Sequence, residues 1–81
     1  MDFPVKHPIK IIGNNIPTFI EIINKATVDR FPDFVLDTNT VRLSKNGRYI
    51  SVTVTILFKN QEELDDLYRA YTSIPDVQFV L

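Results

Sequence analysis

The chain has 81 residues with a net charge of −1 and 44% hydrophobic residues, which predicts one domain, 1–81, near the lower size limit for a stable core. It has no cysteine and only one histidine, His7, so disulfides, thiolate catalysis and a multi-histidine metal site are excluded. No apolar run approaches the roughly 20 residues of a membrane span, and no secretory signal begins the chain. These features predict a cytoplasmic protein without a membrane partner, metal or cofactor.

The first predicted strand covers Val5 to Ile12. Pro8 cannot donate to a strand ladder, so regular pairing is expected to begin near Ile9. Lys10 and Ile12 should then point to one face of the sheet, away from the core. Gly13 is expected to end the strand.

The first helix is predicted from about Ile16 to Arg30, where apolar residues follow helical spacing. Asn15 is the candidate N-cap, and Pro17 suits the first helical turn. Pro32 ends the helix, because the residue before a proline avoids helical geometry.

The clearest pattern is the alternation from Ile50 to Phe58, where large apolar residues alternate with Ser and Thr over the first half. Thr38 to Ser44 predicts the strand before it, and Asn46-Gly47 predicts a two-residue type I′ turn between the strands. That turn fixes the register and therefore the core face. The residue pairs expected to share this face are Leu43 with Ile50 and Val41 with Val52.

The second helix should begin at Asn60, which forms a capping box with Glu63, and end before Pro75. Val77 to Leu81 is the last predicted strand. The order β-α-β-β-α-β predicts an α+β ferredoxin-like sandwich with a four-stranded antiparallel sheet, strand order 4-1-3-2. Both helices cover one face, and the other face, rich in Ser and Thr, stays open.

Short segments spread over nearly the whole chain form a recognisable set. They are Phe3-Pro4, Pro8-Ile-Lys-Ile-Ile-Gly13, Pro32-Asp-Phe34, Ser44-Lys-Asn-Gly-Arg-Tyr49, Ser51-Val-Thr-Val-Thr55, Leu67-Tyr-Arg69 and Val80-Leu81. Together they resemble the YbeD-like family of small bacterial proteins of unknown function. The resemblance implies a ferredoxin-like fold similar to ACT regulatory domains, and it carries over no catalytic residue.

One end of the predicted molecule gathers an anion-binding set. Strand polarity brings the loop after the first strand and the hairpin tip together, and free N–H groups at the start of a helix favour an anion. The candidate ligand-binding residues are Gly13, Asn14, Asn15, Lys45 and Arg48. The alternative is that these residues only end a strand, cap a helix and keep a hairpin tip soluble.

The open sheet face is the second candidate surface, with Lys10, Arg42 and Tyr49 as its candidate residues. Such a face binds RNA in RNA-recognition domains, which place stacking aromatics on the two central strands. Here the central strands carry Ser51 and Thr53 at those positions, and the net charge of −1 disfavours nonspecific nucleic-acid binding.

No nucleophile–base pair or metal-ligand set is found in the sequence, so no catalytic residue is assigned. The sequence therefore predicts a non-enzymatic regulatory or adaptor module that binds a small anionic metabolite or a protein partner. The alternative is a nucleic-acid-binding protein that uses the open face. The exposed edge strands of this topology also predict a weak homodimer.

Overall fold

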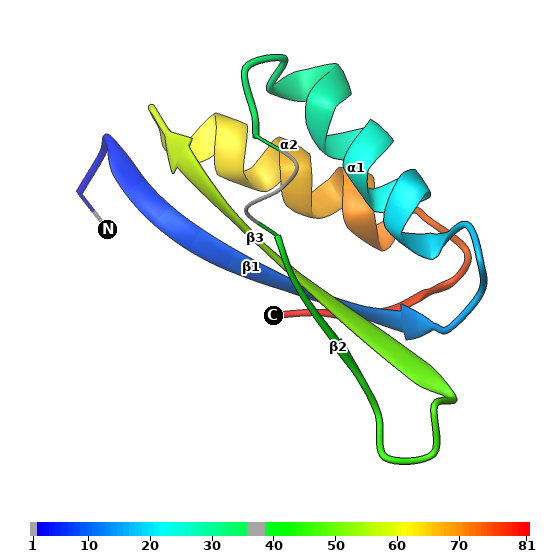
Figure 1. Ribbon diagram of the computed structural model, residues 1–81. Coiled ribbons are helices and arrows are strands. Elements are labelled where there is room, and N and C mark those ends of the chain that lie inside the picture. Colours follow the sequence, from blue (N-terminus) through cyan, green and yellow to red (C-terminus); the bar gives the residue numbers. More distant parts are fainter. Residues whose placement is uncertain (1, 36–38) are drawn as a thin grey trace.

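The computed structural model of the chain describes residues 2–35 and 39–81. A four-stranded antiparallel sheet carries both helices on one face (Figure 1). The elements in chain order are β1 (Val5–Asn14), α1 (Phe19–Arg30), β2 (Thr40–Leu43), β3 (Tyr49–Phe58), α2 (Gln61–Thr72) and β4 (Val77–Val80). The strand order is β2-β3-β1-β4, which confirms the predicted ferredoxin-like topology. None of the helices in these two ranges is long and apolar enough to cross a membrane.

β1 and β3 pair over the full length of both strands, and this ladder includes Pro8, which lies opposite Thr55. The expected start of pairing near Ile9 is therefore wrong. Lys10 and Leu81 exchange two backbone hydrogen bonds of 3.0 and 2.8 Å, so the even-numbered residues of β1 direct their backbone groups toward β4. The pairing with β4 does not reach Pro8, so the missing N–H of this proline faces an open edge rather than β3.

The connection from β1 to α1 also differs from its prediction. β1 continues to Asn14, beyond its expected end, and α1 begins only at Phe19, after Thr18 at the N-cap position. Asn15, the expected cap, instead donates its side-chain N–H to the carbonyl of Gly47 (2.8 Å). A contact with the distant hairpin therefore replaces the local cap.

The register of the β2–β3 hairpin is as predicted, with Leu43 opposite Ile50. The turn type is not. The N–H of Gly47 donates to the carbonyl of Ser44 (2.9 Å), and Gly47, at φ 73°, is the only described residue with positive φ. A type I′ turn needs positive φ at two consecutive residues, so the prediction of that turn is wrong.

The core lies between the helices and one face of the sheet. Every second residue of β3 from Ile50 to Phe58 is buried, as the alternation predicted. Val41 and Leu43 lie on the same face but are 42% and 60% exposed, because β2 is the edge strand next to β3. All four residues of β2 are exposed. The buried apolar residues are Ile9, Ile11, Phe19, Ile23, Ile50, Val52, Val54, Ile56, Phe58, Leu64, Leu67 and Tyr71.

The start of α2 confirms the predicted cap at Asn60, but Glu63 does not complete the capping box as predicted. The side chain of Asn60 accepts the N–H of Glu63 (2.9 Å), and the Glu63 carboxylate accepts the N–H of Lys59 (2.7 Å). The first bond satisfies a backbone donor that a helix N-terminus leaves unpaired. The second holds Lys59, the residue before the cap, instead of the N–H of Asn60 itself.

One buried polar contact joins the two helices. The Thr27 hydroxyl donates to the carbonyl of Ile23 (2.8 Å), so the Tyr71 hydroxyl, at 2.5 Å, must donate to Thr27. Both side chains are fully buried. Burial raises the pKa of Tyr71 to about 12, since the charged phenolate is poorly solvated there.

The first prediction tests the assignment of the two sheet faces. Val54→Asp should unfold the protein, because an unpaired buried carboxylate costs several kcal/mol against a typical total of about 5–15 kcal/mol. Thr53→Asp, one residue away on the open face and opposite Lys10, should change stability by less than about 1 kcal/mol. Thermal melting followed by circular dichroism compares the variants, and a native-like melt for Val54→Asp would contradict the assignment.

The second prediction concerns alkaline pH. Because the pKa of Tyr71 is about 12 in the fold and about 10 when unfolded, its neutral form is favoured by folding. That contribution of about 3 kcal/mol is present below pH 10 and is lost as the pH rises toward 12. Urea unfolding at a series of pH values should show this loss in the wild type and not in Tyr71→Phe. Equal pH dependence in both proteins would contradict the burial of the phenol.

Candidate functional site

The loop after β1 and the tip of the β2–β3 hairpin do meet, as the sequence predicted. The N–H of Asn15 donates to the carbonyl of Arg48 (3.1 Å), and the side-chain N–H of Asn15 donates to Gly47. The predicted residues Gly13, Asn14 and Arg48 thus lie at one end of the sheet, beside Lys45 of the same turn.

Three of the backbone donors expected to be free at this end, those of Asn14, Asn15 and Ile16, are already in use. The N–H groups of Asn14 and Ile16 donate to the carbonyls of Asp76 and Asn14, both at 2.9 Å, and that of Asn15 donates to the hairpin. The Asn14 side chain also contacts the Asp76 carboxylate (3.3 Å), which would repel an anion. An anion site here stays a prediction, and this geometry disfavours it.

Gly13 has a packing role that the sequence did not suggest. A Cβ atom at this position would lie 2.3 Å from both the Asp76 carbonyl oxygen and a ring carbon of Phe19. Only glycine therefore lets the end of β1 pass between α1 and the segment before β4.

The open face of the sheet carries an exposed apolar patch. Pro8 and Ile12 belong to it by their place in β1, and Leu57 by its place in β3. Phe79 pairs directly with Ile12, and Leu81 with Lys10, so both point to the same face. Leu57, Phe79 and Leu81 are 55%, 63% and 65% exposed. We call these five residues the apolar patch.

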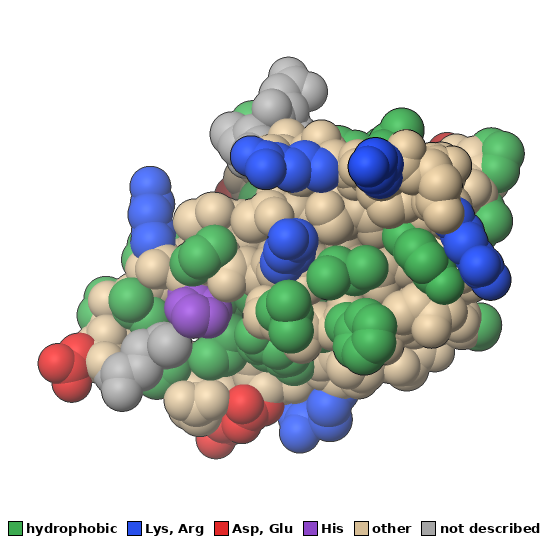
Figure 2. Space-filling view, turned by 90° about the horizontal axis from the view of Figure 1, so that it is seen from below, with side chains coloured by type: hydrophobic (Ala, Val, Ile, Leu, Met, Phe, Trp, Pro, Cys, Tyr) green, Lys and Arg blue, Asp and Glu red, His purple; other side chains and the backbone are tan. Residues whose placement is uncertain are grey.

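This face is free of acidic side chains. β1, β2, β3 and β4 contain no Asp or Glu, whereas Lys6, Lys10 and Arg42 are exposed strand residues. Figure 2 shows hydrophobic side chains gathered in the middle of the face, with basic groups among and around them and acidic groups only at its margins. A protein of net charge −1 thus presents a locally positive sheet face.

The three residues predicted for the open face come together in one shallow depression of about 290 Å³. We call this the cationic depression. Lys10, Arg42 and Tyr49 supply its charged and phenolic groups, and the Arg48 guanidinium lies 5.4 Å from the centre of the Tyr49 ring. The full lining is Lys10, Ile12, Arg42, Leu43, Ser44, Tyr49, Ile50 and Ser51.

Sequence reasoning missed the contribution of Phe79 and Leu81 to this face. The register between β1 and β4 shifts at Ile12 and Gly13, so one residue of β4 bulges and the facing of Phe79 cannot be read by alternation. The signal that was available was the pairing of the last strand with β1 in the predicted topology.

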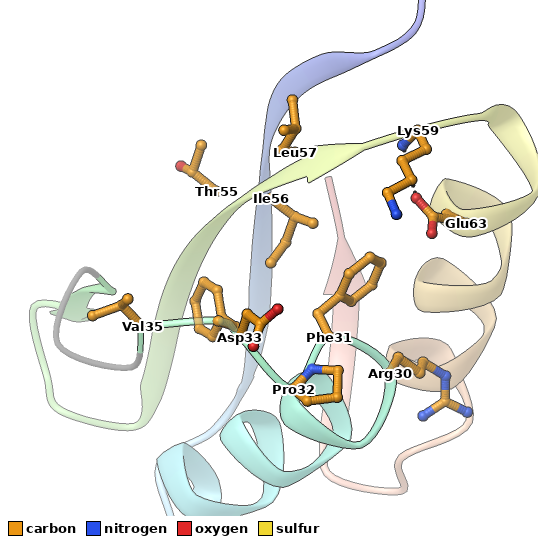
Figure 3. Close-up of a pocket in the computed structure, with 11 residues that line it drawn as sticks. Arg30, Phe31, Pro32, Asp33, Val35, Thr55, Ile56, Leu57, Lys59 and Glu63 are labelled. Carbon is orange, nitrogen blue, oxygen red and sulfur yellow. Dashed lines mark hydrogen bonds between the residues drawn. The ribbon is translucent and has the colours of Figure 1, made fainter.

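A second cavity, of about 500 Å³, lies between the end of β3 and the loop after α1 (Figure 3). Phe31 and Ile56 point into it, whereas Thr55 and Leu57 point away toward the open face. Its polar rim has structural duties: Glu63 accepts the N–H of Lys59, and Arg30 pairs with Asp66 at 2.9 Å. This cavity therefore offers less free polar chemistry than the open face.

Residues 2–35 and 39–81 contain no group of three or more His, Cys, Asp and Glu that could hold a metal ion. His7 lies in β1 opposite Ile56, and no hydrogen bond or ion pair joins it to a carboxylate or hydroxyl in these ranges. The geometry therefore gives no support for a catalytic role of His7.

The third prediction tests the packing role of Gly13. Gly13→Ala should lower the free energy of unfolding by about 2 kcal/mol, because the added methyl group overlaps a carbonyl and a ring. Gly47→Ala is the matched control: no atom lies within 4 Å of its added Cβ, so only the cost of positive φ, about 1 kcal/mol, applies. Urea unfolding measures both, and a smaller loss for Gly13→Ala than for Gly47→Ala would contradict the packing role.

Comparisons with known proteins agree with the fold. Helicobacter pylori protein HP0495 has a similar solution structure, with a TM-score of 0.76 and 14% identity over 100% of this chain and 85% of that one. The ACT domain from the GTP pyrophosphokinase of Chlorobium tepidum gives a TM-score of 0.59 and 18% identity, covering 95% of this chain and 97% of that domain. At these identities the likeness shows an ACT-like ferredoxin fold alone.

Sequence relatives cover essentially the whole chain. A UPF0250 protein of Paraburkholderia phytofirmans is 44% identical, covering 99% of this chain and 90% of that protein. A UPF0250 protein of Neisseria gonorrhoeae is 36% identical, covering 100% of this chain and 89% of that protein. Residues 1–81 match the family described as "Protein of unknown function (DUF493)". The chain therefore belongs to the DUF493 family, the YbeD-like UPF0250 proteins of bacteria, whose function is unknown.

Proposed function

We propose that this protein is a non-enzymatic adaptor or regulatory module that binds a protein partner through the open face of its sheet. The observation that carries the proposal is the apolar patch, whose members Leu57, Phe79 and Leu81 are all more than half exposed. Large exposed apolar groups rimmed by polar residues are typical of protein interaction sites.

The patch has the layout of an interface. An apolar centre with aromatic side chains, a polar rim and few charges at the centre is what protein interfaces present. Ile12 and Phe79 form a direct cross-strand pair, and Arg42 lies to the side. Lys10 lies between Pro8 and Ile12 on β1 and pairs with Leu81, so it is the one cation within the patch. Hydrogen bonds to neighbouring strands hold the backbone of these residues, so little conformational entropy is lost on binding.

A regulatory role is supported by the fold class. The chain shares its ACT-like fold with a domain that forms part of a GTP pyrophosphokinase. This likeness is an analogy of fold, and the described residues offer no nucleophile–base pair that would favour chemistry instead. A small anionic metabolite, the other ligand that the sequence predicts, would find free donors in the cationic depression rather than in the loop after β1.

Nucleic-acid binding is the second candidate, because Lys10, Arg42 and Tyr49 converge in the cationic depression. It is less favoured for two reasons. The open-face positions of β1 and of the middle of β3 carry no aromatic side chain on which bases could stack, and the net charge is −1.

A weak homodimer through the exposed strand edges also stays a prediction.

The fourth prediction tests partner binding directly. A photo-crosslinking residue in place of Phe79, in protein expressed in a bacterium that encodes a DUF493 protein, should give a discrete protein adduct, because Phe79 lies in the proposed interface. The same residue in place of Ile20, a 37% exposed position on α1, is the matched control and should give no such adduct. The adduct is identified by mass spectrometry, and the purified partner is then titrated against wild type and Phe79→Ser.

Phe79→Ser should weaken the binding at least tenfold with an unchanged melting temperature, since aromatic anchors carry most interface energy. Adducts of equal strength from both positions, or a nucleic-acid adduct at position 79, would contradict a protein interface on this face.

A further inference from the structure

We infer that the cationic depression receives the carboxylate side chain of an acidic residue in the protein partner, while the apolar patch receives an apolar residue of the same segment. This inference rests on the proposed function, because it assumes that a protein docks on the open face. It adds the chemistry of the partner: an apolar residue and an Asp or Glu at a defined separation.

The depression offers donors and no competing acid. Lys10 and Arg42 are fixed cations, and Tyr49 and Ser51 add hydroxyl groups. Neither cation takes part in an ion pair within the described part of the chain, where the ion pairs are Lys25–Asp29 and Arg30–Asp66. A carboxylate from outside would therefore find unpaired donors, and charge-assisted hydrogen bonds are the stronger kind.

The hairpin holds the walls of this depression in place. The Ser44 hydroxyl donates to Asn46 (3.0 Å) and accepts the N–H of Tyr49 (3.0 Å), so it is already committed to the turn. Arg42 lies opposite Ser51 in the β2–β3 ladder. The donors of the depression therefore project from paired backbone rather than from a loose loop.

The sheet sets the spacing between the two parts of the surface. One line across the strands runs from Phe79 through Ile12 and Ser51 to Arg42, from apolar to cationic. Ser51 marks the middle of the depression, because β3 lies between β1 with Lys10 and β2 with Arg42. Phe79 and Ser51 are two strand spacings apart, which is about 10 Å. An extended partner spans this distance in about three residues and a helical one in about seven. The partner should therefore carry its acid three or seven positions from its apolar anchor.

A protein carboxylate fits this surface better than a nucleic-acid phosphate. The Ile12 side chain lies on the open face beside the depression, and the neighbouring patch is aliphatic except for Phe79. A second copy docked face to face about a twofold axis would bring the acid-free faces of both copies together. The same cations would then repel one another.

The test uses the full chain, immobilised, and a displayed library of random peptides about 12 residues long, enough to cross the sheet. We expect the enriched peptides to carry Asp or Glu three or seven positions from Leu, Ile or Phe. The best peptide is then synthesised together with a counterpart in which the acid is replaced by its amide. Wild type should bind the counterpart about tenfold more weakly.

Arg42→Gln should reduce this acid preference to less than about twofold, because the fork of donors is gone. Lys25→Gln is the matched control: it removes the same charge from α1, where its side chain is 77% exposed, and should keep the full preference. Neither variant should alter the melting temperature by more than a surface substitution does.

The outcomes separate the two proposals. Peptides that lose binding on Phe79→Ser but show no acid preference would overturn this inference and leave the proposed function standing. A library without any peptide sensitive to Phe79→Ser would overturn both. Binding of a single-stranded RNA that depends on Arg42 and falls steeply with salt, with no such peptide, would also overturn both and favour the nucleic-acid alternative.

Discussion

The ladder between β1 and β3 is the constraint on which the rest of the molecule depends. Its pairing over the full length of two ten-residue strands fixes which side chains face the helices and which face away. Side chains alternate strictly along a strand, so every second residue of β1 and β3 faces the core. The residues between them form the open face. Phe79 and Leu81 of the last strand inherit their facing from this ladder through their pairing with Ile12 and Lys10.

The same alternation divides the charges of the molecule. The acids of residues 2–35 and 39–81 lie outside the strands, several of them in the first turns of α2, where the helix dipole favours negative charge. The strands carry three cations and no acid, whereas α1 and α2 carry six acids and only three cations. Two layers of opposite character therefore make up a chain whose total charge is close to zero, and the total conceals the positive face.

Local rules predicted the parts of the fold that depend on neighbouring residues. The alternation in β3, the register beyond the turn at Gly47 and the cap at Asn60 all follow from short-range patterns, and from them the topology follows. The parts that could not be predicted depend on distant contacts. Asn15 caps no helix because the hairpin takes its side chain. Of the donors predicted for an anion, the N–H of Asn14 is used by Asp76 and that of Asn15 by Arg48. The convergence of Lys10, Arg42 and Tyr49 was predictable from alternation, whereas the facing of Phe79 was hidden by a bulge.

Pro8 has a consequence for how this molecule meets other chains. It lies where β1 extends past the end of β4, so its backbone offers an acceptor at an unpaired edge and no donor. A foreign strand laid along this part of the sheet would find a gap in the ladder, next to the charged side chain of Lys6. Both features protect natural sheets against growth by edge pairing. The central strand can therefore be long enough to carry a broad binding face without seeding polymers or amyloid along its exposed half.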